Sequence, residues 1–133
     1  MRVVFADTVG LLAIWDDRDQ WHQQASVVYA ELLAANARIL TTTYVLLECG
    51  NAAARRPYRD ALIQLRQKLR LNGLLISPCE ADCEVAWNAF ERQSAPSAGI
   101  VDHISFGVMR RLGIHEVFTN DRHFAATGFQ VLF

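Results

Sequence analysis

The chain has 133 residues, of which 52% are hydrophobic and 20% are charged, a composition typical of one globular domain with a buried core. Its formal net charge of −1 gives it no global basic field that would announce a nucleic-acid-binding protein. No apolar run approaches the roughly 20 residues of a membrane-spanning helix, and an acid at position 7 interrupts the N-terminal apolar stretch. We therefore expect a cytoplasmic protein without membrane association.

The pattern along the chain predicts strands that alternate with helices. Strands are expected at residues 2–7, 37–42, 74–78, 115–121 and 129–133. Helices are expected at residues 17–36, 43–56, 58–72, 80–93 and 99–113, with a loop at 94–99 and a helical turn at 122–128. Thr42 or Thr43 can cap the second helix. This alternation indicates a single α/β domain over residues 1–133 with a largely parallel sheet.

The stretch GIVDHISFGVMRRLG, residues 99–113, raises the first question about function. It is expected to form a mostly buried helix, yet Asp102 shares a face with Ser105, Phe106 and Met109. Burying an unpaired carboxylate costs several kcal/mol or forces it to take up a proton. A hydrogen-bonding cap, a basic partner or a metal ion should therefore accompany this carboxylate.

Three further carboxylates are expected near the same edge of the sheet. Asp7 and Asp121 end the first and fourth predicted strands, and Glu48 lies on the helix that follows the second strand. Asp102 stands near the start of its helix, directly after a loop. In open parallel sheets, sites form beyond the carboxyl ends of the strands. Four carboxylates from separate segments can therefore converge there.

Each of these carboxylates, taken alone, also has a structural explanation. Asp7 can cap a helix that begins directly after it, and Asp121 can cap the helical turn at 122–128. Asp102 can be a first-turn acid that the helix dipole favours. Glu48 has the weakest structural explanation, because a residue in the middle of a helix finds no free amide to bind. A purely structural account needs four separate coincidences at one edge.

A cluster of four carboxylates indicates a site for a hard divalent cation. Such groups raise one another's pKa unless a cation neutralises them, and Mg²⁺ or Mn²⁺ fits oxygen ligands with room for water. An ion of this kind serves phosphoryl chemistry, because it acidifies water and neutralises phosphate oxygens. The cysteines Cys49, Cys79 and Cys83 lack the partners of a zinc site. The chain contains no P-loop, dinucleotide fingerprint or nucleophile elbow.

A basic segment between residues 55 and 70 gives the charge an uneven distribution. The segment contains one acidic residue, Asp60. Its basic residues are Arg55, Arg56, Arg59, Arg66, Lys68 and Arg70. Two interpretations remain open at this point: a solvated helix face, or a flank that contacts phosphates.

Four sequence words resemble a PIN-domain ribonuclease, and specifically a VapC-type toxin of a toxin–antitoxin pair. They are FADT around Asp7, DDRDQWHQQA at residues 16–25, TYVLLECGN around Glu48, and VDHISFGVMRRLGIHEVFTNDRHFAATGF around Asp102 and Asp121. The resemblance covers essentially the whole chain, and its most specific part is TNDRHFAATGF. The chain departs from the family pattern at residues 98–101, AGIV, where relatives often carry Ser or Thr.

This resemblance implies a three-layer α/β/α sandwich around a mainly parallel sheet of about five strands. It also implies RNA cleavage that depends on Mg²⁺ or Mn²⁺. The metal-binding and catalytic residues would be Asp7, Glu48, Asp102 and Asp121. A cognate antitoxin would block the site, and the toxin would form a homodimer.

Neighbouring residues complete the expected site. Thr8 and Thr119 match hydroxyl residues that often accompany these acids in the family. Asn51, one helical turn after Glu48, can orient that carboxylate or a metal-bound water. The candidates for binding flanking phosphates of the substrate are Arg55, Arg56 and Arg59.

Two histidines beside the acids are interpreted as structural. His103 follows Asp102 on the same helix, so its side chain points about 100° away, and packing or surface exposure is favoured. His123 lies two residues after Asp121, close enough in sequence to approach a substrate, but a position on a helix face is favoured. His103 is not expected to be a metal ligand.

We therefore predict a single-domain PIN-fold endoribonuclease that uses a metal-activated water and leaves a 5′-phosphate and a 3′-hydroxyl. The alternative is a PIN-fold binding module whose activity has decayed, against which the intact set of four acids argues. A phosphatase or receiver-like pocket ranks last, because the only lysine, Lys68, is far in sequence from any strand end.

The antitoxin is expected to use two features of the toxin. The acidic pocket can accept an arginine. The apolar surface beside the helices at 43–56 and 58–72 can hold an amphipathic partner helix.

Overall fold

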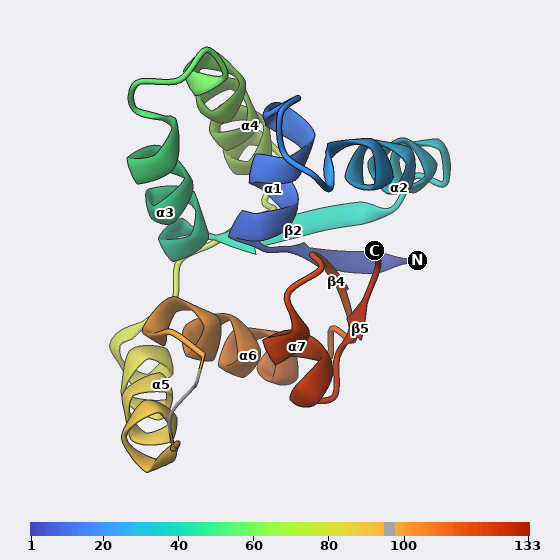
Figure 1. The fold of residues 1–133 in the computed structure, drawn as a ribbon. Helices are drawn as coiled ribbons and strands as arrows, with labels where there is room; N and C mark the ends of the chain where they lie inside the picture. Colours follow the sequence, from blue (N-terminus) through green and yellow to red (C-terminus); the bar gives the residue numbers. More distant parts are fainter. Residues whose placement is uncertain (95–97) are drawn as a thin grey trace.

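The computed structural model describes residues 1–94 and 98–133, which form one five-stranded sheet and seven helices (Figure 1). The strands are β1 (Val3–Ala6), β2 (Arg38–Thr42), β3 (Leu75–Ile76), β4 (Glu116–Phe118) and β5 (Gln130–Val131). The helices are α1 (Thr8–Trp15), α2 (His22–Ala34), α3 (Thr43–Ala53), α4 (Arg59–Leu71), α5 (Glu80–Arg92), α6 (Ile100–Leu112) and α7 (Arg122–Ala126). None of the helices in these two ranges is both long and apolar enough to cross a membrane.

The helices cover both faces of the sheet, which confirms the expected α/β/α sandwich. Helices α1 to α4 lie on one face of the sheet and α5 to α7 on the other (Figure 1). The strand order is β3-β2-β1-β4-β5, and every neighbouring pair is parallel. Because β1 lies between β2 and β4, the crossovers diverge there, and the topological switch point falls at the carboxyl ends of β1 and β4.

Most elements are shorter than the sequence pattern predicts, because turns cut their ends. The helix expected from residue 17 begins at His22, after a turn in which Asp19 Oδ1 accepts a hydrogen bond from Trp21 N at 2.8 Å. Strand β4 stops at Phe118, since Thr119 N donates to Val117 O at 3.1 Å in a three-residue turn. The expected loop at 94–99 includes residues 95–97, which lie outside the described residues.

Strand β1 is the centre of the core. Val4 and Phe5 are fully buried, as expected for a strand covered on both faces. Val4 packs in a cluster with Leu32 of α2, and Phe5 belongs to the larger cluster that includes Val45 of α3 and Phe106 of α6. Burial of successive residues of β1 therefore ties both helical layers to the strand that ends at Asp7.

Gly10 allows the first turn of α1 to lie directly against β4. A Cβ atom at this position would lie 2.1 Å from Phe118 O and 2.8 Å from Phe118 C. No side chain fits at that distance from a backbone carbonyl, so the absence of a side chain is required for this close approach. The contact brings the residues that follow β1 beside the end of β4.

We expect Gly10→Ala to lower the free energy of unfolding by about 1–3 kcal/mol or more, because the added methyl overpacks the contact with the β4 backbone. The matched control is Gly107→Ala in α6, where the new Cβ would meet Val85 Cγ1 at 4.0 Å. This control should be neutral or stabilising by up to about 1 kcal/mol. Urea unfolding followed by tryptophan fluorescence measures both, and equal effects of the two changes would contradict the assignment.

Candidate metal centre

Asp7 and Thr119 lie side by side at the switch point. The β1–β4 register pairs Ala6 with Phe118, so the next residue on each strand is Asp7 or Thr119. Thr119 Oγ1 donates to Asp7 Oδ2 at 3.0 Å and accepts from Asp121 N at 3.1 Å. Both side chains are buried, with 1% exposure for Asp7 and 0% for Thr119. The threonine hydroxyl therefore fixes two of the four predicted acids relative to each other.

Asp7 both caps α1 and has one unpaired oxygen. Its Oδ2 accepts from Val9 N at 3.4 Å, which is the capping role that the sequence allowed. Within residues 1–94 and 98–133, Oδ1 of this buried carboxylate has no hydrogen-bond partner. An orphaned buried carboxylate oxygen is costly in a protein interior. A carboxylate oxygen is a ligand that suits a hard cation, and Asp7 lines a cavity in which such an ion could bind.

Asp102 is the third residue of α6, and it is half-buried. Its Oδ2 accepts from Gly99 N at 3.4 Å, so it is also the first-turn acid that the sequence allowed. Ser105, Phe106 and Met109, on the same side of the helix, are buried as predicted. The weak hydrogen bond to Gly99 leaves the carboxylate with capacity for a further partner.

Asp121 and His123 meet at the start of α7. Asp121 Oδ1 accepts from His123 N at 2.9 Å and lies 2.9 Å from His123 Nδ1. One ligand atom each from Asp102, Asp121 and His123 lie within 4.8 Å of one another. The sequence favoured a helix-face position for His123, and in the structure its partly exposed ring lies beside two of the predicted ligands. The sequence feature that could have indicated this position is the spacing of two residues between Asp121 and His123.

Glu48 joins the site from the middle of α3, on the opposite face of the sheet from α6 and α7. Its side chain is exposed, and its Oε1 accepts from Thr8 Oγ1 at 2.6 Å. A cavity of about 640 Å³ brings the predicted residues together. Its lining residues are Asp7, Thr8, Val9, Leu12, Glu48, Asn51, Ala52, Asp102 and Asp121. All four predicted acids, Thr8 and Asn51 therefore face one space.

The electrostatics of the cavity favour either protons or a cation. Burial, with a further contribution from Asp102, raises the pKa of Asp7 to about 7. Burial, followed by the charges of Asp121 and Glu48, raises the pKa of Asp102 to about 6. Without a cation, these two carboxylates hold protons at pH values where ordinary carboxylates are ionised. A divalent ion would instead stabilise their charged forms.

The arginines expected to bind substrate do not line the cavity. Arg55 and Arg56 are exposed beyond the end of α3, one turn after the lining residues Asn51 and Ala52. Arg59 begins α4 and makes a 3.8 Å contact with Asp60. The three arginines are therefore placed outside the acidic cavity, between the end of α3 and the first residue of α4.

His103 and Cys49 have structural surroundings. His103 Nε2 lies 2.7 Å from Gln93 Oε1, and its ring packs against Phe90 and Phe106. This agrees with the packing interpretation. Cys49 is a buried free thiol, and burial raises its pKa to about 12, so it stays protonated at neutral pH.

The raised pKa values predict an unusual pH dependence of stability in EDTA. Between about pH 4 and 7, folded Asp7 retains a proton that the unfolded chain releases, because its pKa rises from 3.8 to about 7. Stability should therefore fall as pH rises through this window, by roughly 1–4 kcal/mol for this group. Asp7→Asn keeps a capping side chain and removes the charge, so it should be more stable than the wild type at pH 8.

Thermal unfolding in EDTA across this pH range tests the expectation, with exposed Asp17→Asn as the matched control. The control should follow the wild-type curve. A wild-type stability that rises steadily from pH 4 to pH 8 would contradict the assignment of a buried, protonated Asp7.

Comparison with known proteins agrees with this geometry. The family model of the PIN domain matches residues 4–130. Two curated relatives, both called 23S rRNA-specific endonuclease VapC20, come from Mycobacterium tuberculosis strains CDC 1551 / Oshkosh and ATCC 25618 / H37Rv. Each is 30% identical, over 96% of this chain and 95% of the relative.

A solved structure is similar over the same extent. The crystal structure of M. tuberculosis VapC20, described as a sarcin–ricin loop cleaving toxin, superposes with a TM-score of 0.77 and 26% identity, covering 95% of both chains. The sequence resemblance is thus confirmed by the family model, by curated relatives and by fold. The chain belongs to the PIN-domain family, in its VapC group.

Proposed function

We propose that this chain is a divalent-metal-dependent endoribonuclease and the toxin of a type II toxin–antitoxin pair. The observation that carries the proposal is the buried Oδ1 of Asp7, which has no partner in the described part of the chain and belongs to a cavity that Glu48, Asp102 and Asp121 also line. Carboxylate oxygens with room for water favour Mg²⁺ or Mn²⁺. The naming of two relatives as rRNA endonucleases supports RNA as the substrate.

The residues of the cavity have separable tasks in this proposal. Asp7, Asp102 and Asp121 would hold the ion, while Thr119 fixes Asp7 through its 3.0 Å hydrogen bond. Thr8, at the start of α1, restrains Glu48 of α3 through a hydrogen bond of 2.6 Å from its Oγ1 to Glu48 Oε1. When bound, the ion supplies charge that neutralises phosphate oxygens and acidifies a water molecule. The hydroxyl groups keep the carboxylates oriented before the substrate arrives.

The flanking arginines would bind RNA outside the reaction centre. The acidic cavity repels a phosphate backbone until a cation is bound, so the affinity for RNA must come from positive groups nearby. Arg55 and Arg56 extend the α3 side of the cavity by one turn beyond Asn51. Their exposure leaves both guanidinium groups accessible to phosphates on either side of the scissile bond.

We propose 23S rRNA as the first substrate to test. Two relatives carry that specificity in their names, and the solved relative is described as cleaving the sarcin–ricin loop. The similarity spans 95% or more of this chain, so it includes the loops around the cavity as well as the core. Intact ribosomes and protein-free RNA should therefore both be offered to the protein.

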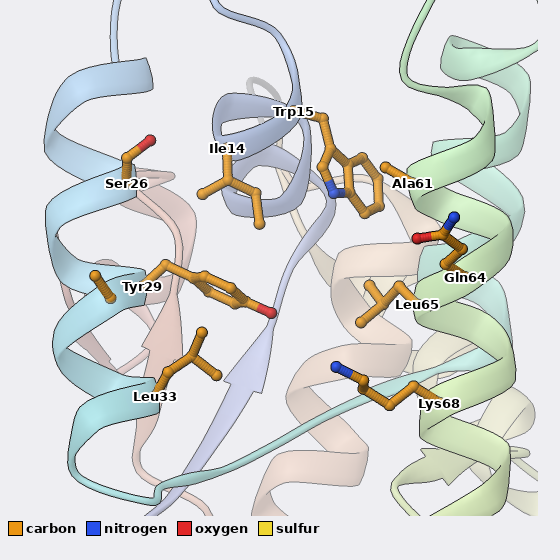
Figure 2. A pocket seen from close by; sticks show the side chains of 10 residues that line it. Ile14, Trp15, Ser26, Tyr29, Leu33, Ala61, Gln64, Leu65 and Lys68 are labelled. Carbon is orange, nitrogen blue, oxygen red and sulfur yellow. The ribbon is translucent and has the colours of Figure 1, made fainter.

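The cognate antitoxin would occupy a groove between α1, α2 and α4. This groove has a volume of about 460 Å³, and Trp15, Tyr29 and Leu65 point into it from the three helices (Figure 2). A second cavity of about 290 Å³ adjoins it and shares Leu33 and Lys68. An amphipathic antitoxin helix can place apolar residues on Leu33 and Leu65 and a carboxylate at Lys68.

The surface expected from the sequence, between α3 and α4, holds a smaller hollow of about 280 Å³ lined by Leu46, Leu47, Leu62 and Ile63. The groove in Figure 2 is larger and carries the only lysine of the chain, so we favour it for the antitoxin. Association into a homodimer is part of the proposal by resemblance to VapC toxins.

Cleavage should require both a divalent ion and Asp102. We expect Asp102→Asn to lower the cleavage rate by about 100-fold or more. Loss of a residue that only supports a metal ligand lowers activity by about 10–100-fold, and loss of a metal ligand itself should cost more. Primer extension on RNA from treated ribosomes and from protein-free total RNA, with Mg²⁺, Mn²⁺ or EDTA, measures this. Asp17→Asn is the matched control and should keep the wild-type rate. Cleavage in EDTA, or full activity of Asp102→Asn, would refute the proposed function.

The arginines should affect RNA affinity and its salt dependence. Replacing Arg55 and Arg56 with Gln should weaken RNA binding several-fold and reduce the slope of log K against log salt by about 0.7 per lost contact. Fluorescence anisotropy with a labelled RNA and the inactive Asp102→Asn background measures both quantities. Arg70→Gln, in the last turn of α4, is the control and should leave both unchanged. If the slope of log K against log salt is unchanged in the double variant, Arg55 and Arg56 do not contact RNA phosphates and belong to a solvated surface.

A further inference from the structure

His123 lies beside Asp102 and Asp121, two acids of the cavity, without a role in the function described so far. Its side chain is 48% exposed, so burial does not account for its position. Nδ1 lies 2.9 Å from Asp121 Oδ1, which also accepts from the backbone N of His123 at 2.9 Å. The ring is therefore tied to one predicted metal ligand while the rest of it remains accessible.

The distances suit a shared ion. One ligand atom each from His123, Asp102 and Asp121 lie within 4.8 Å of one another. Two ligands on opposite sides of an ion with bonds of about 2.1 Å are about 4.2 Å apart, so small side-chain rotations suffice. The orphaned Oδ1 of Asp7 points to a cation independently, because it lines the cavity that Asp102 and Asp121 also line.

We propose that His123 supplies a nitrogen ligand to the metal ion held by Asp102 and Asp121, and that this ligand makes the site prefer Mn²⁺ to Mg²⁺. The inference rests on the proposed function, because it assumes that the cavity binds a divalent ion. Neutral imidazole binds transition metals through either ring nitrogen. Mg²⁺ instead takes oxygen ligands and water almost exclusively, so an imidazole in the site disfavours it relative to Mn²⁺.

The rival explanation is that His123 only orients Asp121. In that case the ring donates from Nδ1 to the Asp121 carboxylate and never contacts the ion, as histidine partners of metal-binding carboxylates do elsewhere. Both explanations predict weaker metal binding when His123 is replaced. A direct reading of the atoms bound to the metal is therefore needed to separate them.

The test is pulsed electron paramagnetic resonance of Mn²⁺ added to the full-length wild-type protein. We expect a nitrogen hyperfine coupling of a directly bound ligand, which changes from the ¹⁴N to the ¹⁵N pattern when the histidines alone are labelled with ¹⁵N. His123→Gln should lose this coupling. His115→Gln, an exposed histidine before β4 at the opposite end of that strand from Asp121, should keep it.

Calorimetry provides a second measurement that does not depend on activity. His123→Gln should bind Mn²⁺ about 10-fold more weakly, with a smaller change for Mg²⁺. His123→Asp, which makes the site all-oxygen, should lower the ratio of Mn²⁺ to Mg²⁺ affinity below that of the wild type.

The outcomes separate the two proposals. Mn²⁺ that binds to the wild type without a histidine nitrogen coupling would overturn the role of His123 and leave the metal-dependent nuclease intact. Failure of wild-type protein to bind Mn²⁺ would overturn both. Because the decisive spectrum is recorded on the wild type, a variant that folds poorly would not change the conclusion.

Discussion

The contact between Asp7 and Thr119 is the constraint on which the rest of the site depends. It forms because β1 and β4 are adjacent and parallel with Ala6 opposite Phe118, and because Gly10 leaves room for α1 against the β4 backbone. The same hydroxyl accepts from Asp121 N, so Thr119 holds the acid that follows β4 close to the acid that follows β1. Burial of this pair removes Asp7 from water and leaves one carboxylate oxygen without a donor among the residues that the structure describes. A cation is the partner that satisfies that oxygen without adding a side chain.

Three of the four acids combine a capping role in the fold with the metal-binding role that we propose. Asp7 caps α1, Asp102 accepts from the backbone at the start of α6, and Asp121 caps α7. Each cap leaves an oxygen or a lone pair directed elsewhere, so capping fixes the carboxylate without using all its hydrogen-bonding capacity. The explanations weighed as alternatives from the sequence are thus compatible. Glu48 differs, because a side chain, Thr8, holds it instead of a helix terminus.

Helix α1 connects the acidic cavity to the proposed antitoxin groove. Its first turn supplies Thr8 and Val9 to the acidic cavity, and its last turn supplies Ile14 and Trp15 to the groove of Figure 2. The two sites are therefore only about two helical turns apart on one rigid element. A partner seated in the groove can reach the acids with a short extension of its chain.

The sequence by itself determined the alternation of strands and helices, the parallel sheet and the four acids at its edge, because periodicity, capping residues and strand ends are local properties of the chain. It also identified the family, through words that span Asp7 to Asp121. Only the tertiary structure decided that Arg55, Arg56 and Arg59 lie outside the cavity, that Asp7 has an orphaned oxygen and that His123 lies beside Asp102. These outcomes depend on the direction of side chains from segments far apart in sequence. The packing of α6 and α7 against one sheet sets those directions, and spacing along a single helix does not encode them.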